Sequence, residues 1–388
     1  MHQSPFKPLP NRFFLQRLAL TMGSFLLLAT FSAAEQTPFS LKQLHLPEGF
    51  HIAVFADNID SARMLTFTPG GVLLVSESGE GKVVALPDPK HTGQAAREVD
   101  VLSGLNEPHG IAFYQGKLYV AENDKVRRYD WDEVNLRASN PVKLADLPTG
   151  GGHSTRSILF HGGKMYISAG SSCNVCIEKD PRRATVMELN PDGSGQKIFA
   201  KGLRNAVGIA ENPKTDTVWV TVNGRDWLGD DLPPETIYDL GKNGGDAGWP
   251  YCYGDRVPDS NFTKAGDNRC ASVLEPKVQM QAHSAPLGLA FYEGTMFPPE
   301  YRNNIFVAFH GSWNRSVPTG YKIVRVKLDD NGQPVSGAQD FITGWLAPGE
   351  TKHGRWMGRP VGIAFAADGS MFLSDDTGGL IYRVTYGK

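Results

Sequence analysis

The stretch VGIAFAADGSMFLSDD, from Val361 to Asp376, holds two short apolar runs separated by a turn that contains Asp368 and Gly369. Two runs of this kind around a polar turn are typical of paired β-strands. The chain repeats the arrangement, because five earlier segments show a similar first run, then a turn and a second run. The earlier first runs are RMLTF from Arg63, HGIAF from His109, RSILF from Arg156, VGIAE from Val207 and LGLAF from Leu287.

The spacing of the six copies matches the length of a β-propeller blade. Equivalent positions lie 46, 47, 51, 80 and 74 residues apart, whereas a four-stranded blade needs about 40 to 50 residues. The two long intervals are a blade plus an insertion. A TIM barrel would need a helix in every unit, and a two-sheet sandwich would not repeat at this period. The sequence therefore predicts an all-β fold: one six-bladed β-propeller over residues 35–388, with insertions in the fourth and fifth repeats.

Composition and charge limit the possible partners. The chain has 388 residues, of which 40% are hydrophobic, so it can bury a substantial core. Its formal net charge is −2 and it has no basic run interleaved with aromatic residues, so nucleic-acid binding is not expected. Motifs for nicotinamide binding, phosphoryl transfer and serine hydrolysis are missing from the sequence. A small-molecule partner is therefore expected.

The first 34 residues are predicted to be a signal peptide. Basic residues precede an apolar stretch from Leu18 to Phe31, and small residues lie just before Glu35. The apolar stretch is short for a transmembrane helix. An uncleaved membrane anchor is the alternative interpretation. We expect cleavage near Ala34, export to the periplasm and no membrane span in the mature chain.

Four cysteines agree with export. Cys173 and Cys176 form a CxxC motif, and Cys252 and Cys270 flank a polar loop. An even number of cysteines in an exported chain favours two local disulfides. A redox pair or half of a zinc site is the alternative for the CxxC motif. The sequence predicts Cys173 bonded to Cys176 and Cys252 bonded to Cys270.

Polar residues precede several of the first runs. The segment GGHSTRSILF, from Gly151 to Phe160, places His153 and Arg156 directly before the third of them. A polar turn ahead of a core strand is the simpler explanation of such a histidine. In a propeller, however, the starts of equivalent strands point toward one central channel. The equivalent place in the repeats holds Arg63, His109, Arg156 and Arg359. This pattern predicts a pocket to which several blades contribute.

A known family shares several segments with this chain. In order, they are GGHSTRSILF, then GLRNAVGIAENPKTDTVWVTVNGRDWLGDDLPPETIYDL with GWPYCYG, then HGSWNRSVPTGYKIVRV, and finally GRPVGIAFAADGSMFLSDD. Together they resemble the glucose/sorbosone dehydrogenase family, and most closely its sorbosone-dehydrogenase-like branch. Members are soluble six-bladed propellers that use pyrroloquinoline quinone (PQQ). The resemblance extends from about His51 to the end of the chain.

The resemblance implies roles for individual residues. His153 matches the general base that takes the substrate hydroxyl proton, a task that suits a side chain with a pKa near neutrality. Arg204 and Asn205 match the residues that hold the quinone, whose three carboxylates suit a guanidinium. The backbone carbonyls of Gly224 and Arg225 match ligands of a Ca²⁺ ion, a hard cation that prefers oxygen. A solvated acidic loop is the alternative interpretation of this last segment.

The chain also departs from the soluble glucose dehydrogenases. These have an aspartate just before the catalytic histidine, where this chain has Gly152, and a pair of arginines near the last blade, of which only Arg359 is matched. They also have a lysine near the end of the fifth repeat, for which His310, Arg315 and Lys322 are the candidates. The resemblance therefore adds Arg359, His310 and Arg315 to the predicted quinone-binding residues, and it leaves the sugar undefined.

Three functions follow as hypotheses. The first is a periplasmic PQQ- and calcium-dependent dehydrogenase that oxidises an aldose or aldehyde sugar, sorbosone-like or glucose-like, by hydride transfer to the quinone and passes electrons to a soluble acceptor. The second is a calcium-dependent, lactonase-like propeller hydrolase. The third is a non-catalytic propeller that binds a carbohydrate or a protein. A lactonase needs several inward carboxylates as metal ligands, and the repeats show no such set, so the first hypothesis is favoured.

Overall fold

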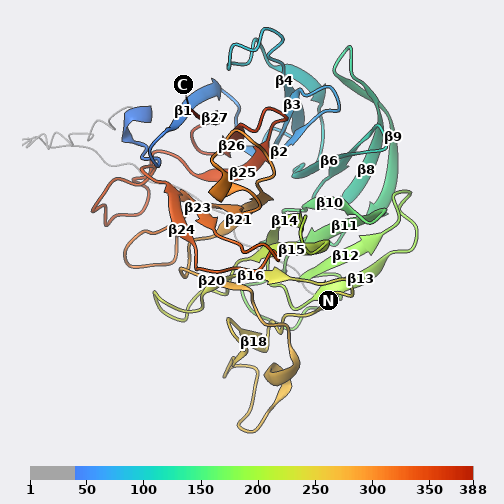
Figure 1. The fold of residues 1–388 in the computed structure, drawn as a ribbon. Coiled ribbons are helices and arrows are strands. Elements are labelled where there is room, and N and C mark those ends of the chain that lie inside the picture. The colour runs from blue at the N-terminus through green and yellow to red at the C-terminus, as the bar shows by residue number, and fades with distance from the viewer. Residues whose placement is uncertain (1–39, 388) are drawn as a thin grey trace, which may run out of the picture. The chain divides into compact units, whose positions relative to one another are not determined.

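The computed structural model describes residues 40–387. In this range the chain forms six sheets of four or five strands, arranged in a ring around a central channel (Figure 1). The predicted all-β, six-bladed propeller is confirmed. The predicted signal peptide, residues 1–34, lies outside the described residues. No helix between residues 40 and 387 is long and apolar enough to cross a membrane.

We number the blades 1 to 6 in chain order. In each blade the first strand lies next to the channel and the later strands follow outward. Blades 1 to 3 consist of β2 (Ala62–Phe67), β3 (Leu73–Glu77), β4 (Lys82–Leu86) and β5 (Val99–Leu102); β6 (Gly110–Tyr114), β7 (Lys117–Ala121), β8 (Lys125–Asp132) and β9 (Arg137–Asp146); and β10 (Ile158–His161), β11 (Lys164–Ala169), β12 (Thr185–Leu189) and β13 (Lys197–Lys201). Blades 4 to 6 consist of β14 (Ala206–Asn212), β15 (Thr217–Val222), β16 (Glu235–Asp239) and β20 (Val278–Met280); β21 (Pro286–Phe291), β22 (Ile305–Phe309), β23 (Lys322–Val326) and β24 (Gln339–Ile342); and β25 (Pro360–Phe365), β26 (Met371–Asp375), β27 (Leu380–Tyr386) and β1 (Phe50–Ala56).

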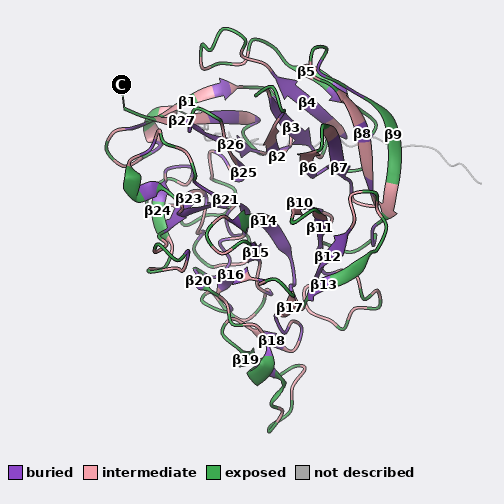
Figure 2. Ribbon diagram, turned by 45° about the vertical axis from the view of Figure 1, so that its right-hand side comes forward, coloured by how far each residue is buried: buried purple, intermediate pink, exposed green. Residues whose placement is uncertain are grey.

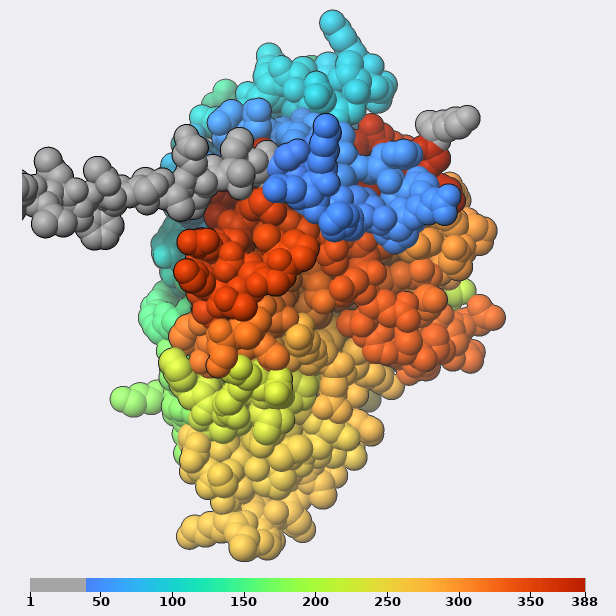
Figure 3. All heavy atoms as spheres, turned by 90° about the vertical axis from the view of Figure 1, so that its left-hand side faces the viewer, coloured from blue at the N-terminus to red at the C-terminus, as the bar shows by residue number. Residues whose placement is uncertain are grey.

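Strand β1 closes the ring. It is the outermost strand of blade 6 and pairs antiparallel with β27, with Phe50 opposite Tyr386. In Figure 3 the first described residues, in blue, lie against segments from the last third of the chain, in orange and red. Strands from the two ends of the described chain thus share one sheet, so the ring has no open seam between blade 6 and blade 1.

The long connection of blade 4 lies between β16 and β20 and projects beyond the ring (Figure 1). It contains the 3₁₀ helix η2 (Arg269–Ser272), a two-stranded sheet of β18 (Cys252–Tyr253) and β19 (Val257–Pro258), and β17 (Gly245–Asp246), which pairs parallel with β13 of blade 3. The Cys252–Cys270 disulfide lies in this connection, and Cys173–Cys176 follows β11. Both predicted disulfides are confirmed. Two further 3₁₀ helices are η1 (Leu41–Gln43) and η3 (Pro299–Tyr301).

The hydrophobic core lies between neighbouring blades rather than in one central mass. Between blades 1 and 2, for example, Leu74 and Val83 pack in one buried cluster with Leu118 and Val120. Figure 2 shows that the inner strands are mostly buried, whereas much of the outer strand β9 is exposed. Because each blade buries both of its faces against neighbours, the middle strands are continuous apolar runs rather than alternating ones.

Glycines let the first strands of neighbouring blades approach closely at the channel. A Cβ atom added at Gly110, Gly208, Gly288 or Gly362 would lie 2.3 to 2.6 Å from a carbonyl oxygen of the next blade. Some of these carbonyls also accept hydrogen bonds from hydroxyls across the blade interface. The Ser374 hydroxyl, for instance, donates to the Arg63 carbonyl over 2.5 Å. The blade interface therefore has no room for a side chain at these positions.

We expect Gly288→Ala to destabilise the propeller by about 1 to 3 kcal/mol, because the new methyl group would lie 2.4 Å from the backbone oxygen of Val361 and the two blades must move apart. Chemical denaturation measures the change in unfolding free energy. Gly337→Ala is the matched control, since a Cβ atom there would have no neighbour within 4 Å. Equal stability of the two variants would show that this close approach is not needed.

Candidate active site

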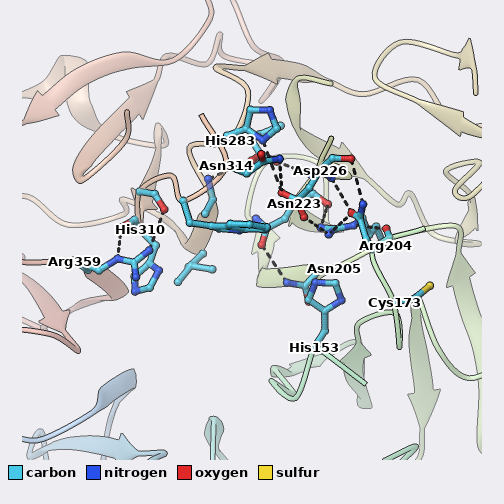
Figure 4. A pocket seen from close by; sticks show the side chains of 18 of the residues that line it. His153, Cys173, Arg204, Asn205, Asn223, Asp226, His283, His310, Asn314 and Arg359 are labelled. Carbon is cyan, nitrogen blue, oxygen red and sulfur yellow. Dashed lines mark hydrogen bonds and ion pairs between the residues drawn. The ribbon is translucent and has the colours of Figure 1, made fainter. Parts of the chain in front are cut away.

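A cavity of about 430 Å³ lies at one end of the channel (Figure 4). In each blade the start of the first strand pairs with the end of the second, as Ala62 does with Glu77, so the loops before the first strands and after the second strands meet at the same end. These loops supply most of the cavity wall, and residues within strands, such as Arg63 of β2 and Glu235 of β16, complete it. The charged and titratable side chains that line it are Arg63, His153, Arg204, Asp226, Glu235, His283, His310 and Arg359.

His153 lies in the loop before β10. Its Nδ1 is 2.9 Å from the Ser171 carbonyl oxygen and 3.0 Å from the Ser171 hydroxyl oxygen. A carbonyl oxygen can only accept, so Nδ1 carries the proton and Nε2 is the unprotonated nitrogen. Burial and the positive charge of Arg204 lower the pKa of His153 to about 4, so the ring is neutral at neutral pH. The side chain is therefore a proton acceptor with a defined tautomer.

Arg204 lies in the loop before β14 and its side chain is buried. Its Nη2 is 3.0 Å from a carboxylate oxygen of Asp226 and 2.9 Å from the Asn174 side-chain oxygen, while its Nε donates to the Asn174 carbonyl over 2.8 Å. The contact of its Nη1 with the Asn223 carbonyl is long, at 3.4 Å. One edge of the guanidinium is thus held by the protein, and Nη1 is the group left for an anionic ligand.

Asn205 points into the same cavity. Its Nδ2 donates to the Asn223 side-chain oxygen over 3.1 Å, whereas its own Oδ1 is buried and has no hydrogen-bond partner among the described residues. A Cβ atom at Gly170 would lie 2.4 Å from this Oδ1 and 2.7 Å from the His153 Cβ atom, so the glycine lets the two side chains come together. An unpaired buried acceptor costs about 1 to 3 kcal/mol, which a donor group on a ligand would recover.

The opposite wall of the cavity holds His310 and Arg359 (Figure 4). His310 Nε2 is 3.0 Å from both carboxylate oxygens of Asp376, and Arg63 Nη1 is 2.7 Å from one of them. Burial alone would raise the pKa of Asp376, but its hydrogen bond to His310 and the charge of Arg63 outweigh burial and hold that pKa well below its usual range. Arg359 donates to the carbonyls of His310 and Gly311, at 3.0 Å each.

The predicted calcium-binding segment lies beside Arg204. Gly224 lines the cavity, and its N–H donates to the Glu235 carboxylate over 2.6 Å. Burial raises the pKa of Glu235 to about 7. The Arg225 side chain does not line the cavity, because it forms a buried ion pair of 2.5 Å with Asp259. Only backbone oxygens of this segment, together with nearby carboxylates such as Glu235, could serve a hard cation here.

The structure places two of the candidates from the fifth repeat elsewhere. The Arg315 guanidinium donates to the Asp230 carbonyl and lies 3.0 Å from the Asp231 carboxylate, so it crosslinks two loops and does not line the cavity. Lys322 forms an ion pair with Asp340 on the neighbouring strand. Of the three candidates, only His310 lines the cavity, and we do not propose a quinone contact for Arg315.

The ring of polar residues before the first strands is only partly in the cavity. Arg63 and Arg359 line it, whereas His109 and Arg156 are buried outside it. Arg156 donates to backbone carbonyls, among them that of Pro148 at 2.6 Å, so it supports the loop that carries His153. Burial lowers the pKa of His109 well below its usual value, and the positive charge of Arg63 lowers it further.

Several cavity residues were not singled out in the sequence. They are Asn174, Asn223, Glu235 and Asn314. Asn223 directly follows the second strand of its blade, as His310 and Asp376 do in theirs. Aligning the ends of the second runs, as well as the starts of the first runs, would have revealed this second set of polar positions.

The cavity suits the quinone that the sequence implied. Three arginines, Arg63, Arg204 and Arg359, reach it from three blades, and PQQ carries three carboxylates. The unpaired Oδ1 of Asn205 can accept a hydrogen bond from a ring N–H. The arrangement thus combines anion-binding groups with a neutral histidine in one partly enclosed space.

Known proteins share this sequence and fold. A Borreliella burgdorferi protein described as uncharacterized is 32% identical over 97% of this chain and 99% of its own length. A Coprinopsis cinerea PQQ-dependent pyranose dehydrogenase is 26% identical over 92% of this chain, but the match spans only 56% of that enzyme. This chain also resembles the calcium structure of a Trichoderma reesei enzyme of carbohydrate-active enzyme family AA12, with a TM-score of 0.79 and 23% sequence identity. The superposition covers 91% of this chain and 100% of that one. At this identity the likeness shows the fold alone.

Homologues of this chain are thus PQQ-dependent sugar dehydrogenases. The TrAA12-like family description matches residues 44–238 and 242–387, which is almost the whole propeller. The chain belongs to the TrAA12-like family.

Proposed function

We propose that this chain is a PQQ- and calcium-dependent dehydrogenase that oxidises an aldose or aldehyde sugar, sorbosone-like or glucose-like, and passes the electrons to a soluble acceptor. One observation carries the proposal: an unprotonated His153 Nε2 and the Arg204–Asn205 pair converge on one cavity. The activity of its homologues supports the same chemistry.

In this proposal Arg63, Arg204 and Arg359 hold the quinone carboxylates, and Asn205 Oδ1 accepts a hydrogen bond from the ring system. Bound PQQ supplies a two-electron acceptor for the hydride of the sugar carbon. His153 takes the sugar hydroxyl proton at Nε2. The resulting imidazolium is stabilised by the Ser171 carbonyl, which accepts a hydrogen bond from Nδ1–H over 2.9 Å.

For calcium we propose the carbonyls of Gly224 and Arg225 as ligands. Support comes from the position of Glu235, which is buried and whose carboxylate accepts from the Gly224 N–H over 2.6 Å. A divalent cation in this place would stabilise the ionised carboxylate.

The hydrolase alternative has less support. Among residues 40–387, the clusters of three or more metal-ligating side chains are Cys173–Cys176–Glu178 and His161–Glu211–Asp216. The first contains a disulfide and the second lies outside the cavity. Neither is a set of inward carboxylates of the kind that a metal-dependent lactonase would use.

We also propose export to the periplasm through cleavage near Ala34. The two disulfides support this proposal, because disulfides persist in oxidising compartments. Amino-terminal sequencing of the exported protein tests it, since cleavage at the proposed place leaves Glu35 first.

Absorption spectra test the dehydrogenase proposal. Purified protein loaded with PQQ and Ca²⁺ is expected to show a quinone band that converts to the reduced form when an aldose is added, and not when the corresponding alditol is added. Chelating Ca²⁺ before loading is expected to prevent quinone binding. Failure to bind PQQ would favour a non-catalytic propeller, and lactone hydrolysis without PQQ would favour the hydrolase.

A further inference from the structure

The loop after β11 forms the part of the cavity wall between His153 and Arg204. It runs from Ser171 to Glu178, and within it the Cys173–Cys176 disulfide closes residues 173–176 into a tight ring. Cys173 and Asn174 line the cavity (Figure 4). The proposed chemistry assigns a role only to the Ser171 carbonyl of this loop.

Asn174 makes four hydrogen bonds with the part-buried Arg204–Asp226 ion pair of the cavity. Its Oδ1 accepts from Arg204 Nη2 over 2.9 Å and from the Asp226 N–H over 2.8 Å. Its carbonyl accepts from Arg204 Nε over 2.8 Å, and its Nδ2 donates to the Asp226 carbonyl over 3.2 Å. One asparagine thus joins three loops, which belong to blades 3 and 4.

These contacts determine how Arg204 faces the cavity. A salt bridge to Asp226 at 3.0 Å holds only Nη2 and leaves the guanidinium plane free to rotate about that contact. The two hydrogen bonds to Asn174 hold Nε and Nη2 together, so the plane is fixed and Nη1 remains for a ligand. A pre-oriented guanidinium loses less entropy when it binds an anion.

The disulfide holds the loop that carries Asn174. Both cysteines flank the Asn174–Val175 pair. The Ser171 hydroxyl donates to the Cys173 carbonyl over 2.6 Å, and the same hydroxyl oxygen accepts from His153 Nδ1. The loop therefore contacts the proton-accepting histidine through Ser171 and the proposed quinone-binding arginine through Asn174.

We propose that Asn174, held in the Cys173–Cys176 loop, is a positioning residue that orients Arg204 for the carboxylates of the quinone. This inference rests on the proposed quinone binding. It assigns to the CxxC motif a role in preorganising the cavity rather than in redox chemistry or zinc binding.

Titration of the protein with PQQ in excess Ca²⁺, followed by tryptophan fluorescence, tests the inference. Asn174→Ala is expected to weaken PQQ binding by roughly 10-fold or more, because the loss of a hydrogen bond to a charged group typically changes affinity by about this factor. At saturating PQQ, kcat is expected to recover to within about 3-fold of wild type, because the proton acceptor is still in place. Asn190→Ala is the matched control: it removes side-chain hydrogen bonds to Lys164 and Ser194 far from the cavity and should leave the affinity unchanged.

A double-mutant cycle separates positioning from general stability. In an Arg204→Ala, Asp226→Asn background, which has neither member of the ion pair, Asn174→Ala is expected to change PQQ affinity by less than about 2-fold. A purely structural role would lower the affinity equally in both backgrounds and would overturn the inference. So would an unchanged affinity of the single Asn174→Ala variant. If the wild-type protein itself binds no PQQ, the proposed function fails and the inference fails with it.

The disulfide is tested by Cys173→Ala together with Cys176→Ala. This variant is expected to bind PQQ more weakly than wild type, as Asn174→Ala does. Adding Asn174→Ala to it should have little further effect on the affinity. Wild-type affinity in the cysteine variant would show that the loop holds Asn174 without the disulfide and would overturn that part of the inference.

Discussion

His153→Gln is expected to lower kcat by roughly 10² to 10⁴, the usual contribution of a positioned general base. Glutamine can still donate an amide hydrogen to the Ser171 carbonyl, so the loop keeps its shape, but its side chain cannot take up a proton. Quinone affinity is expected to stay close to that of wild type. Steady-state rates at saturating PQQ and sugar, together with melting temperatures, measure the effect.

His153→Ala serves as the comparison. It removes the hydrogen bond to Ser171 as well as the base, so it should lose stability in addition to turnover. If His153 only satisfies a turn, glutamine will leave kcat unchanged and only the alanine variant will differ, in its melting temperature. An unchanged kcat in His153→Gln would end the catalytic assignment.

The pH dependence of the wild-type enzyme provides a second check of the same residue. His153 acts as a base only when neutral, so kcat/KM should be constant at neutral pH and fall as the pH drops through the pKa of His153, which is about 4 without ligand. The charge of Arg204 contributes to that low value, and a bound tricarboxylate offsets this charge. The acid limb of the quinone-loaded enzyme is therefore expected above pH 4, and it should be absent from the residual activity of His153→Gln.

Arg204→Ala is expected to weaken PQQ binding by roughly 30-fold or more, because a buried carboxylate of the ligand loses its guanidinium partner. The structure adds a consequence for stability. Arg204 forms a part-buried ion pair with Asp226, so the variant removes the guanidinium partner of that carboxylate and should also lower the free energy of unfolding, by about 1 to 3 kcal/mol. Quinone titration and chemical denaturation measure the two effects separately.

The variant Arg204→Ala, Asp226→Asn separates two explanations of weak binding. It has no carboxylate without its guanidinium partner at this position, so its stability should recover in part. If Arg204 contacts the quinone directly, PQQ binding remains weak in this variant. Recovery of wild-type affinity would mean that Arg204 serves only to neutralise Asp226, and that the quinone is held by the other arginines of the cavity.

The architecture was predictable from the sequence because a propeller is built from local units. Each blade consists of neighbouring strands joined by short turns, so its apolar runs and turn residues recur at a regular interval that can be counted without coordinates. The same regularity placed Arg63, His109, Arg156 and Arg359 at equivalent blade ends, and two of them, Arg63 and Arg359, line the cavity. The two disulfides were also predictable, since each joins cysteines close in the chain.

Only the tertiary structure decided the contacts that join distant segments. Nothing local marks β1 as the last strand of blade 6, because it pairs with β27 from the far end of the chain. In the same way, Arg315 and Asn174 both lie in loops and both have polar side chains. Arg315 contacts the acidic loop at Asp231, whereas Asn174 contacts Arg204 in the cavity wall. Hydrophobic periodicity reports which face of a strand is buried, but the partner of a polar loop residue depends on how the closed ring brings loops of different blades together.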